Sequence, residues 1–195
     1  MNIVFHRYNS ICEPAYIDAY KSLGIAVIED DLEMTDKSIP ADVRISTIAG
    51  LILKNRPLFV FSINFFPYIS DICDKLGCLY VCVTVDCPVA ELYSVSIRNK
   101  CNRIFLFDSA QYEEIAGQTL GEVIYLPLGV NPAIADAARH TQYRYDVSFI
   151  GSLYNEKNPY AVIRSKLSAR VRGKCDGLLD AQELIGGLEI LDSVI

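Results

Sequence analysis

A chain of 195 residues is long enough for one domain of ordinary size and an additional segment. Hydrophobic residues make up 51% of it and charged residues 22%, which is the balance of a globular protein and not of a disordered one. The formal net charge is −6 and no run of Lys or Arg exceeds two residues, which argues against a nucleic-acid partner.

The N-terminus and the apolar segments also argue against a signal peptide and a membrane span. The opening residues, MNIVFHRYNS, have no charged region ahead of their short apolar stretch. The most apolar region, 58–66, is interrupted by Ser62 and Asn64 and stays well below the roughly 18 apolar residues of a spanning helix. We therefore expect a cytoplasmic protein without a membrane span.

The seven cysteines predict neither a disulfide framework nor a metal site. Their number is odd, no C-x-x-C spacing occurs, and His6 and His140 lie far from the cysteine-rich stretch. Free cysteine behaves as a small hydrophobic residue, and four of the seven stand in apolar segments: Cys73, Cys78, Cys82 and Cys101. We expect reduced thiols and no bound metal.

Short apolar segments alternate with helical patterns over the first two thirds of the chain. In chain order, strands are predicted at 3–5, 25–28, 58–63, 79–85, 104–107 and 123–126, with helices between them near 14–23, 43–52, 68–76, 90–98 and 110–116. Pro14 is typical of a helix start, and Gly24 and Gly77 are typical of helix ends. Strands that are almost entirely apolar are buried on both faces, so the pattern predicts a Rossmann-like, doubly wound parallel sheet of the α/β class.

Polar residues follow the predicted strands, at the edge where open parallel sheets bind their ligands. They are His6, Asp30, Asn64, Asp86 and Asp108. Each has an ordinary structural alternative. Asp108 is placed to cap the helix that follows it, Asp86 is as consistent with a cap as with a ligand contact, and a single histidine is more often structural than catalytic.

Several common sites are absent from the sequence. There is no G-x-G-x-x-G after the first strand, no G-x-x-x-x-G-K-[ST] phosphate loop and no G-x-S-x-G nucleophile elbow. The usual dinucleotide-dependent, NTP-hydrolysing and α/β-hydrolase functions are therefore disfavoured, and no cofactor is expected.

The composition changes near residue 130. The turn-forming segment 126–132 has Asn131 as a helix cap and Pro132 at the first position of a helix, and a polar interval follows. Residues 145–152 predict a new strand that runs into a Gly151-Ser152 turn, whose backbone N–H groups could approach a phosphate. Two helices are predicted beyond it, at 160–172 and 181–194, with a turn at 175–177 between them. We expect a domain at 1–130, a linker at 131–144 and the incomplete start of a second domain at 145–195.

An ordered set of segments resembles the CgeB-like spore maturation proteins, which are bacterial proteins of the GT-B glycosyltransferase type. The segments are SINFFP (62–67), VTVDCP (83–88), FLFD (105–108), YLPLGVN (125–131) and YDVSFIGS (145–152). The resemblance runs from about residue 55 to the end, and residues 1–54 match it in general pattern alone. It implies two Rossmann-like domains that face each other across a cleft, with this chain supplying the N-terminal, acceptor-side domain and the start of the donor-side domain.

The resemblance implies transfer of a sugar from a nucleotide-sugar to an acceptor hydroxyl, without a metal. His6 or Asp86 would be the base that deprotonates the hydroxyl. Asn64, Asp108 and Asn131 would contact substrate, and the Gly151-Ser152 turn would face the donor diphosphate. Because the donor side lacks its remaining strands, the chain alone is expected to be inactive.

Two other functions remain open at this point. A stand-alone flavodoxin-like ligand-binding module would also have short parallel strands with acidic residues at their ends. The acidic cluster at 29–31 follows the second strand instead of the first, and Asp108 stands where a receiver domain has Lys, which disfavours a phosphorylated receiver. An interaction protein is the third possibility, with the C-terminal helices docking on a partner or forming a homodimer.

Overall fold

The computed structural model describes residues 1–36, 38–139, 142, 144–151 and 158–185. Its centre is one sheet of six parallel strands in the order β2-β1-β3-β4-β5-β6. The strands are β1 (Asn2–His6), β2 (Ala26–Asp30), β3 (Phe59–Ile63), β4 (Leu79–Val83), β5 (Asn102–Leu106) and β6 (Glu122–Tyr125). The predicted α/β class and doubly wound parallel sheet are confirmed.

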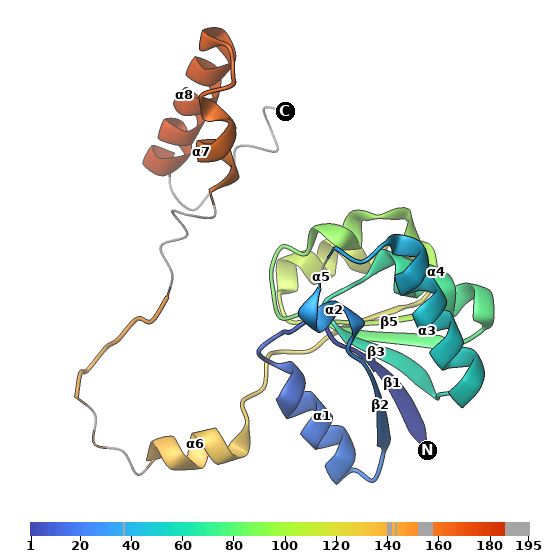
Figure 1. Ribbon diagram of the computed structural model, residues 1–195. Helices are drawn as coiled ribbons and strands as arrows, with labels where there is room; N and C mark the ends of the chain where they lie inside the picture. Colours follow the sequence, from blue (N-terminus) through green and yellow to red (C-terminus); the bar gives the residue numbers. More distant parts are fainter. Residues whose placement is uncertain (37, 140–141, 143, 152–157, 186–195) are drawn as a thin grey trace. The chain divides into compact units, whose positions relative to one another are not determined.

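Helices pack on both faces of this sheet (Figure 1). One face packs against α3 (Ala41–Asn55), α4 (Pro67–Leu76), α5 (Ser109–Ala116) and two 3₁₀ helices, η1 (Ala90–Tyr93) and η2 (Val95–Arg98). The other face packs against α1 (Glu13–Ser22) through Ile17. In β1, Ile3 and Phe5 face α1, while Val4 faces the core on the opposite side of the sheet. Because both faces of the strand are buried, these three successive residues are all apolar and do not alternate with polar ones.

The strand order has one reversal, and it lies between β1 and β3. The chain passes from β1 outward to β2, returns to β3 on the other side of β1, and then continues in one direction to β6. A reversal of this kind separates the loops that leave the two central strands and leaves room for a ligand at their carboxyl ends. A ligand site is therefore expected among the residues that follow β1, β3 and β4.

The helix ends follow local signals that are visible in the sequence. Gly77 ends α4 with φ of +65°, and the Asp108 carboxylate accepts the backbone N–H of Gln111 at 2.8 Å as the N-cap of α5. The single helix predicted at 90–98 is instead η1 and η2. Ser94 has extended backbone angles between them, which interrupts a continuous helix. A short helix that was not predicted, α2 (Leu32–Thr35), follows β2.

The chain divides into two compact units, Met1–Thr141 and Gln142–Ile195. Helix α6 (Pro132–Arg139) of the first unit begins at the proline predicted to start a helix. The described residues of the second unit contain α7 (Pro159–Arg164) and α8 (Ala169–Ile185).

Two expectations for the second unit are corrected. Residues 145–150 form no strand, because a strand needs a neighbour to pair with and none is present among this unit's described residues. The turn predicted at 175–177 lies inside α8, since one Gly costs a helix only about 1 kcal/mol and the remaining residues support it. Of the second predicted helix, 186–194 lies outside the described residues.

Candidate functional site

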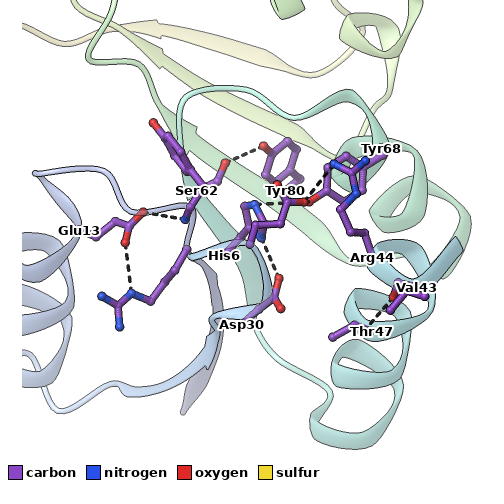
Figure 2. A network of polar contacts seen from close by, with 12 residues as sticks. His6, Glu13, Asp30, Val43, Arg44, Thr47, Ser62, Tyr68 and Tyr80 are labelled. Atoms are coloured by element: carbon purple, nitrogen blue, oxygen red, sulfur yellow. Dashed lines mark hydrogen bonds and ion pairs between the residues drawn. The ribbon is translucent and has the colours of Figure 1, made fainter. Parts of the chain in front are cut away.

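Two groups of polar side chains meet at the carboxyl ends of the central strands. The first is a buried network that begins at His6, the last residue of β1 (Figure 2). The second lies further out and joins the loops after β1, β3 and β4. Together they occupy the edge of the sheet that the strand order marks as a ligand site.

His6 is fully buried and has a partner for each ring nitrogen. Its Nδ1 lies 2.7 Å from Oδ2 of Asp30, the last residue of the neighbouring strand β2. Its Nε2 lies 3.3 Å from the hydroxyl of Tyr68. The Asp30 carboxylate can accept a hydrogen bond from Nδ1, and the Tyr68 hydroxyl covers Nε2. An external substrate could reach Nε2 only if the Tyr68 side chain moved.

Tyr68 extends the buried network to α2 and α3. Its hydroxyl donates to Oε1 of Glu33 at 2.8 Å, and the same carboxylate oxygen accepts from Arg44 at 3.3 Å. The Arg44 guanidinium also lies over the Tyr68 ring, 5.7 Å from its centroid. Burial first, and then the bond to Glu33, raise the pKa of the Tyr68 hydroxyl above its ordinary value. Tyr68 therefore remains a neutral hydrogen-bonding group that connects His6 to an ion pair.

Asn64 organises the outer group from a left-handed backbone conformation. It follows β3 with φ of +58°, a region that Asn enters more readily than most residues. Its side-chain Oδ1 accepts the backbone N–H of Val85 at 3.0 Å, which ties the end of β3 to the end of β4. Its Nδ2 donates to Oδ2 of Asp86 at 2.6 Å and to the hydroxyl of Tyr8 at 3.1 Å.

Asp86 is the exposed acid of this edge. Its Oδ2 is held by Asn64, and within the described part of the chain its Oδ1 accepts no hydrogen bond. Two aromatic side chains border the same group: the Tyr8 ring packs edge-on against Phe66 at 5.2 Å, and Phe66 packs edge-on against His6 at 4.7 Å. The outer group thus combines a positioned, solvent-accessible carboxylate, an amide and aromatic surface.

A chain of buried hydroxyls supports the loop that carries Asn64 and Phe66. The backbone N–H of Phe66 donates to the Tyr80 hydroxyl at 2.9 Å, which lies 2.6 Å from the hydroxyl of Ser62 (Figure 2). Ser62 in turn donates to the carbonyl of Asn64 at 2.7 Å. The loop after β3 is therefore held from beneath by two strands of the sheet.

The Glu13 carboxylate holds the loop after β1 in place through hydrogen bonds to its backbone. It is almost fully buried, and its Oε1 accepts the backbone N–H groups of Tyr8 and Ser10, each at 2.8 Å. Its other oxygen accepts from Arg7 at 3.2 Å (Figure 2). Tyr8 is thereby fixed where its hydroxyl meets Asn64.

The other residues named from the sequence lie elsewhere. Asp108 caps α5, as the structural alternative predicted, and its contact with substrate stays a prediction. Asn131 lines a separate hollow of about 440 Å³ between α1 and residues 129–132. Gly151 is exposed in the second unit, and Ser152 lies outside the described residues. The structure thus brings together His6 with Asp30, and Asn64 with Asp86.

The tyrosines, the glutamates and the arginine that complete both groups have little signal in the sequence. Tyr68 stands in the first turn of α4, immediately after Pro67, and the proximity of that helix start to β1 depends on the strand order. Glu33 and Arg44 lie on α2 and α3, and α2 was not predicted. The one available signal for Tyr8 was its place in the loop after the first strand.

No group of three or more His, Cys, Asp or Glu side chains in the described residues is arranged to hold a metal ion. None of the helices in the described part of the chain has both the length and the apolar character needed to cross a membrane. Scanning the sequence against protein-family models produced no match, and a search of curated proteins found no similar sequence.

Proposed function

We propose that this chain is the acceptor-side part of a GT-B-type glycosyltransferase, which transfers a sugar from a nucleotide-sugar to an acceptor hydroxyl. The observation that carries the proposal is the exposed Asp86 carboxylate at the carboxyl edge of a parallel sheet. It is held by Asn64, which also donates to the Tyr8 hydroxyl, and the Tyr8 ring packs against Phe66. The proposal is also supported by the resemblance of five segments of the chain to CgeB-like proteins.

Asp86 is a better candidate for the base than His6. In the proposed reaction the base takes the proton of the acceptor hydroxyl, that oxygen forms a bond to the anomeric carbon of the sugar, and the nucleoside diphosphate leaves. A base must be within hydrogen-bond reach of the hydroxyl. Asp86 is exposed, and none of the described residues donates to its Oδ1, whereas His6 is fully buried and both its nitrogens face protein groups.

Other groups of the edge have supporting roles in this proposal. Asn64 orients the carboxylate by holding one of its two oxygens. The rings of Tyr8 and Phe66 offer apolar surface to the faces of a sugar, and the Tyr8 hydroxyl offers a hydrogen bond. Burial raises the pKa of Tyr8, so that hydroxyl stays protonated at neutral pH. His6, which is bonded to Asp30, contacts the Phe66 ring and the Tyr68 hydroxyl and so positions both side chains.

An immunoblot first establishes the length of the protein in its native cell. The test is then a turnover assay on the protein of that length. A panel of UDP- and GDP-sugars is screened for acceptor-dependent release of nucleoside diphosphate. Asp86→Asn should lower turnover at least about tenfold, because a base is removed while the hydrogen bond from Asn64 can be kept. Glu113→Gln, an exposed change on α5, is the matched control and should leave turnover unchanged.

Two outcomes would count against the proposal in different ways. Turnover that Asp86→Asn does not alter would remove Asp86 as the base and leave the transferase function standing. An absence of turnover with every donor, in a protein that binds none of them, would overturn the transferase function itself.

A second candidate is a ligand-binding module without catalysis, and the strand order favours it. The order β2-β1-β3-β4-β5 is that of flavodoxin-like domains, which bind ligands at the β1/β3 reversal. A phosphorylated receiver is the version that can be tested directly, with acetyl phosphate as donor and intact mass as readout. Asp30 is bonded to the buried His6, so we expect no phosphoryl adduct on it.

A further inference from the structure

The end of α4 brings two cysteines together through a standard helix-ending motif. Gly77 has φ of +65°, its N–H donates to the carbonyl of Asp74 at 3.3 Å, and the N–H of Cys78 donates to the carbonyl of Cys73 at 2.9 Å. These two bonds define a Schellman motif, in which the side chains at the two ends of the longer bond usually form an apolar contact. Here both of those side chains are thiols.

Both cysteines belong to the same buried cluster, and their thiols differ in environment. The interaction between the two side chains raises the pKa of Cys73, as does burial, and lowers the pKa of Cys78. Cys78 in its protonated form can also donate to the Leu79 carbonyl, 3.5 Å away.

Access from solvent also distinguishes the pair. Cys73 is 0% exposed, whereas Cys78 is 9% exposed and lines a surface hollow of about 350 Å³. The hollow lies between the end of α3 and the end of α4, and its lining includes Arg56, Pro57 and Leu76. A small oxidant can therefore approach Cys78 from the hollow, whereas Cys73 has no exposed surface.

The remaining cysteines of this region are less suited to such a reaction. Cys82 is fully buried, which raises its pKa, and burial raises the pKa of Cys101 to about 11. Cys87 is exposed, but partial burial and the neighbouring Asp108 carboxylate raise its pKa. A reactive thiol needs both thiolate character and access, with a second thiol nearby to complete a disulfide.

We propose that Cys78 and Cys73 form a thiol pair that hydroperoxides oxidise to a disulfide across the end of α4. The Cys78 thiolate attacks one peroxide oxygen, so that an S–O bond forms, the O–O bond breaks, and water or an alcohol leaves. The Cys73 sulfur then attacks the resulting sulfenic acid. The S–S bond forms, the S–O bond breaks, and hydroxide leaves as water with the Cys73 proton. The two thiols lose two electrons in total, and the hydroperoxide accepts them.

The sequence provides a direct readout in the unmodified chain. Trypsin cuts after Lys54, Lys75 and Arg98, and the bond between Arg56 and Pro57 resists it. The products are a peptide 55–75 with Cys73 as its one cysteine and a peptide 76–98 with Cys78, Cys82 and Cys87. After treatment with hydrogen peroxide, the intact chain should lose two hydrogens, and these two peptides should appear joined, with fragment ions placing the bond at Cys78.

Variants assign the two roles. Cys78→Ser should abolish the joined peptides, while Cys87→Ser, which removes the exposed thiol of the same peptide, should form them at the wild-type rate. Cys73→Ala should accumulate a sulfenic acid at Cys78 that dimedone traps. Should a variant fail to fold, the wild-type peptide map still decides. The proposal is overturned if peroxide modifies Cys87 without joining the peptides, or if the bond maps to Cys82 or Cys87.

Discussion

At the scale of single residues, Tyr80 connects the core to the candidate site. Tyr80 belongs to β4, and its ring lies in the buried core. Its hydroxyl accepts from the Phe66 N–H and bonds to the Ser62 hydroxyl, which donates to the Asn64 carbonyl. A buried polar group left without a partner costs more than an ordinary hydrogen bond contributes. The stability of the molecule and the geometry of the loop after β3 therefore depend on the same hydroxyl.

Tyr80→Phe tests this dependence. The change leaves the Phe66 N–H without an acceptor, and we expect a loss of about 1–3 kcal/mol in the free energy of unfolding, measured by urea denaturation. Tyr93→Phe is the matched control, because that hydroxyl bonds to Glu114 at the surface, and its effect should stay within about 0.5 kcal/mol. Equal effects of the two changes would show that the buried hydroxyl chain is not needed for stability.

At the scale of helices and strands, two glycines show opposite effects of backbone conformation: one ends a helix and the other lies inside one. Gly77 ends α4 in the left-handed region, where a Cβ is strained, whereas Gly50 lies inside α3. A Cβ at either position would meet none of the described residues within 4 Å beyond its chain neighbours and its own helix backbone. Backbone conformation alone therefore distinguishes the two sites.

The same substitution should have opposite signs at the two positions. Gly77→Ala should lower the free energy of unfolding by roughly 1–2 kcal/mol, the cost of left-handed geometry for a residue with a Cβ. Gly50→Ala should raise it by up to about 1 kcal/mol, since Ala favours an exposed helix interior. Denaturant titrations of both variants give the comparison, and a loss at Gly50 would contradict the helix assignment there.

Helices α7 and α8 are joined by an ion pair that predicts a pH dependence. Arg164 donates to both oxygens of Asp176, at 3.0 and 2.7 Å, and the Tyr160 hydroxyl donates to one of them at 2.6 Å. The bonds from Arg164 and then from Tyr160 lower the pKa of Asp176. A carboxyl with a lowered folded-state pKa stabilises the fold above its unfolded pKa, and this contribution is lost as the pH falls through the folded value.

Carboxyl ¹³C NMR of the whole chain can measure this effect. The midpoint of Asp176 should lie below the ordinary value of about 3.9, and Arg164→Gln should move it up toward that value. A midpoint that Arg164→Gln leaves in place would show that the ion pair is not formed in solution.

At the scale of the whole molecule, the first unit contains both clusters of buried apolar side chains. Every member of these two cores lies between Ile3 and Val123. The second unit has its own polar link between α7 and α8 and exposes several apolar side chains, including Val162 and Leu184. The homodimer expected through these helices stays a prediction, which sedimentation of the full chain can test.

A chain that ends at Thr141 should fold and unfold cooperatively. Because the cores are complete within it, its thermal midpoint should fall within about 4 °C of that of the full chain, the shift that roughly 1 kcal/mol produces in a domain of this size. Circular dichroism at the helical minimum measures both. A much lower midpoint would show that residues after Thr141 stabilise the sheet.

The features that could be predicted from the sequence have a local physical origin. Apolar strands without alternation predicted a sheet buried on both faces, and all six strands are present within a few residues of their expected bounds. Gly77 and Asp108 act at helix ends as predicted, because their effects depend on backbone angles and N–H groups no more than a few residues away. The polar residues at the strand ends could also be predicted, because each one stands at or just after the end of a strand in the sequence.

Which of those residues meet depends on how the strands are ordered in the sheet. His6 pairs with Asp30 from 24 positions away and with Tyr68 from 62, and Asn64 reaches Tyr8 over 56. These partners are set by the strand order, which places β1 between β2 and β3, and no local pattern encodes that order. The segment 145–150 was expected to be a strand and is not one. Its apolar residues are not sufficient, because a segment forms a strand only when another strand completes its hydrogen bonds. Burial and pairing over long stretches of chain therefore determined the site, while local propensity determined the elements that carry it.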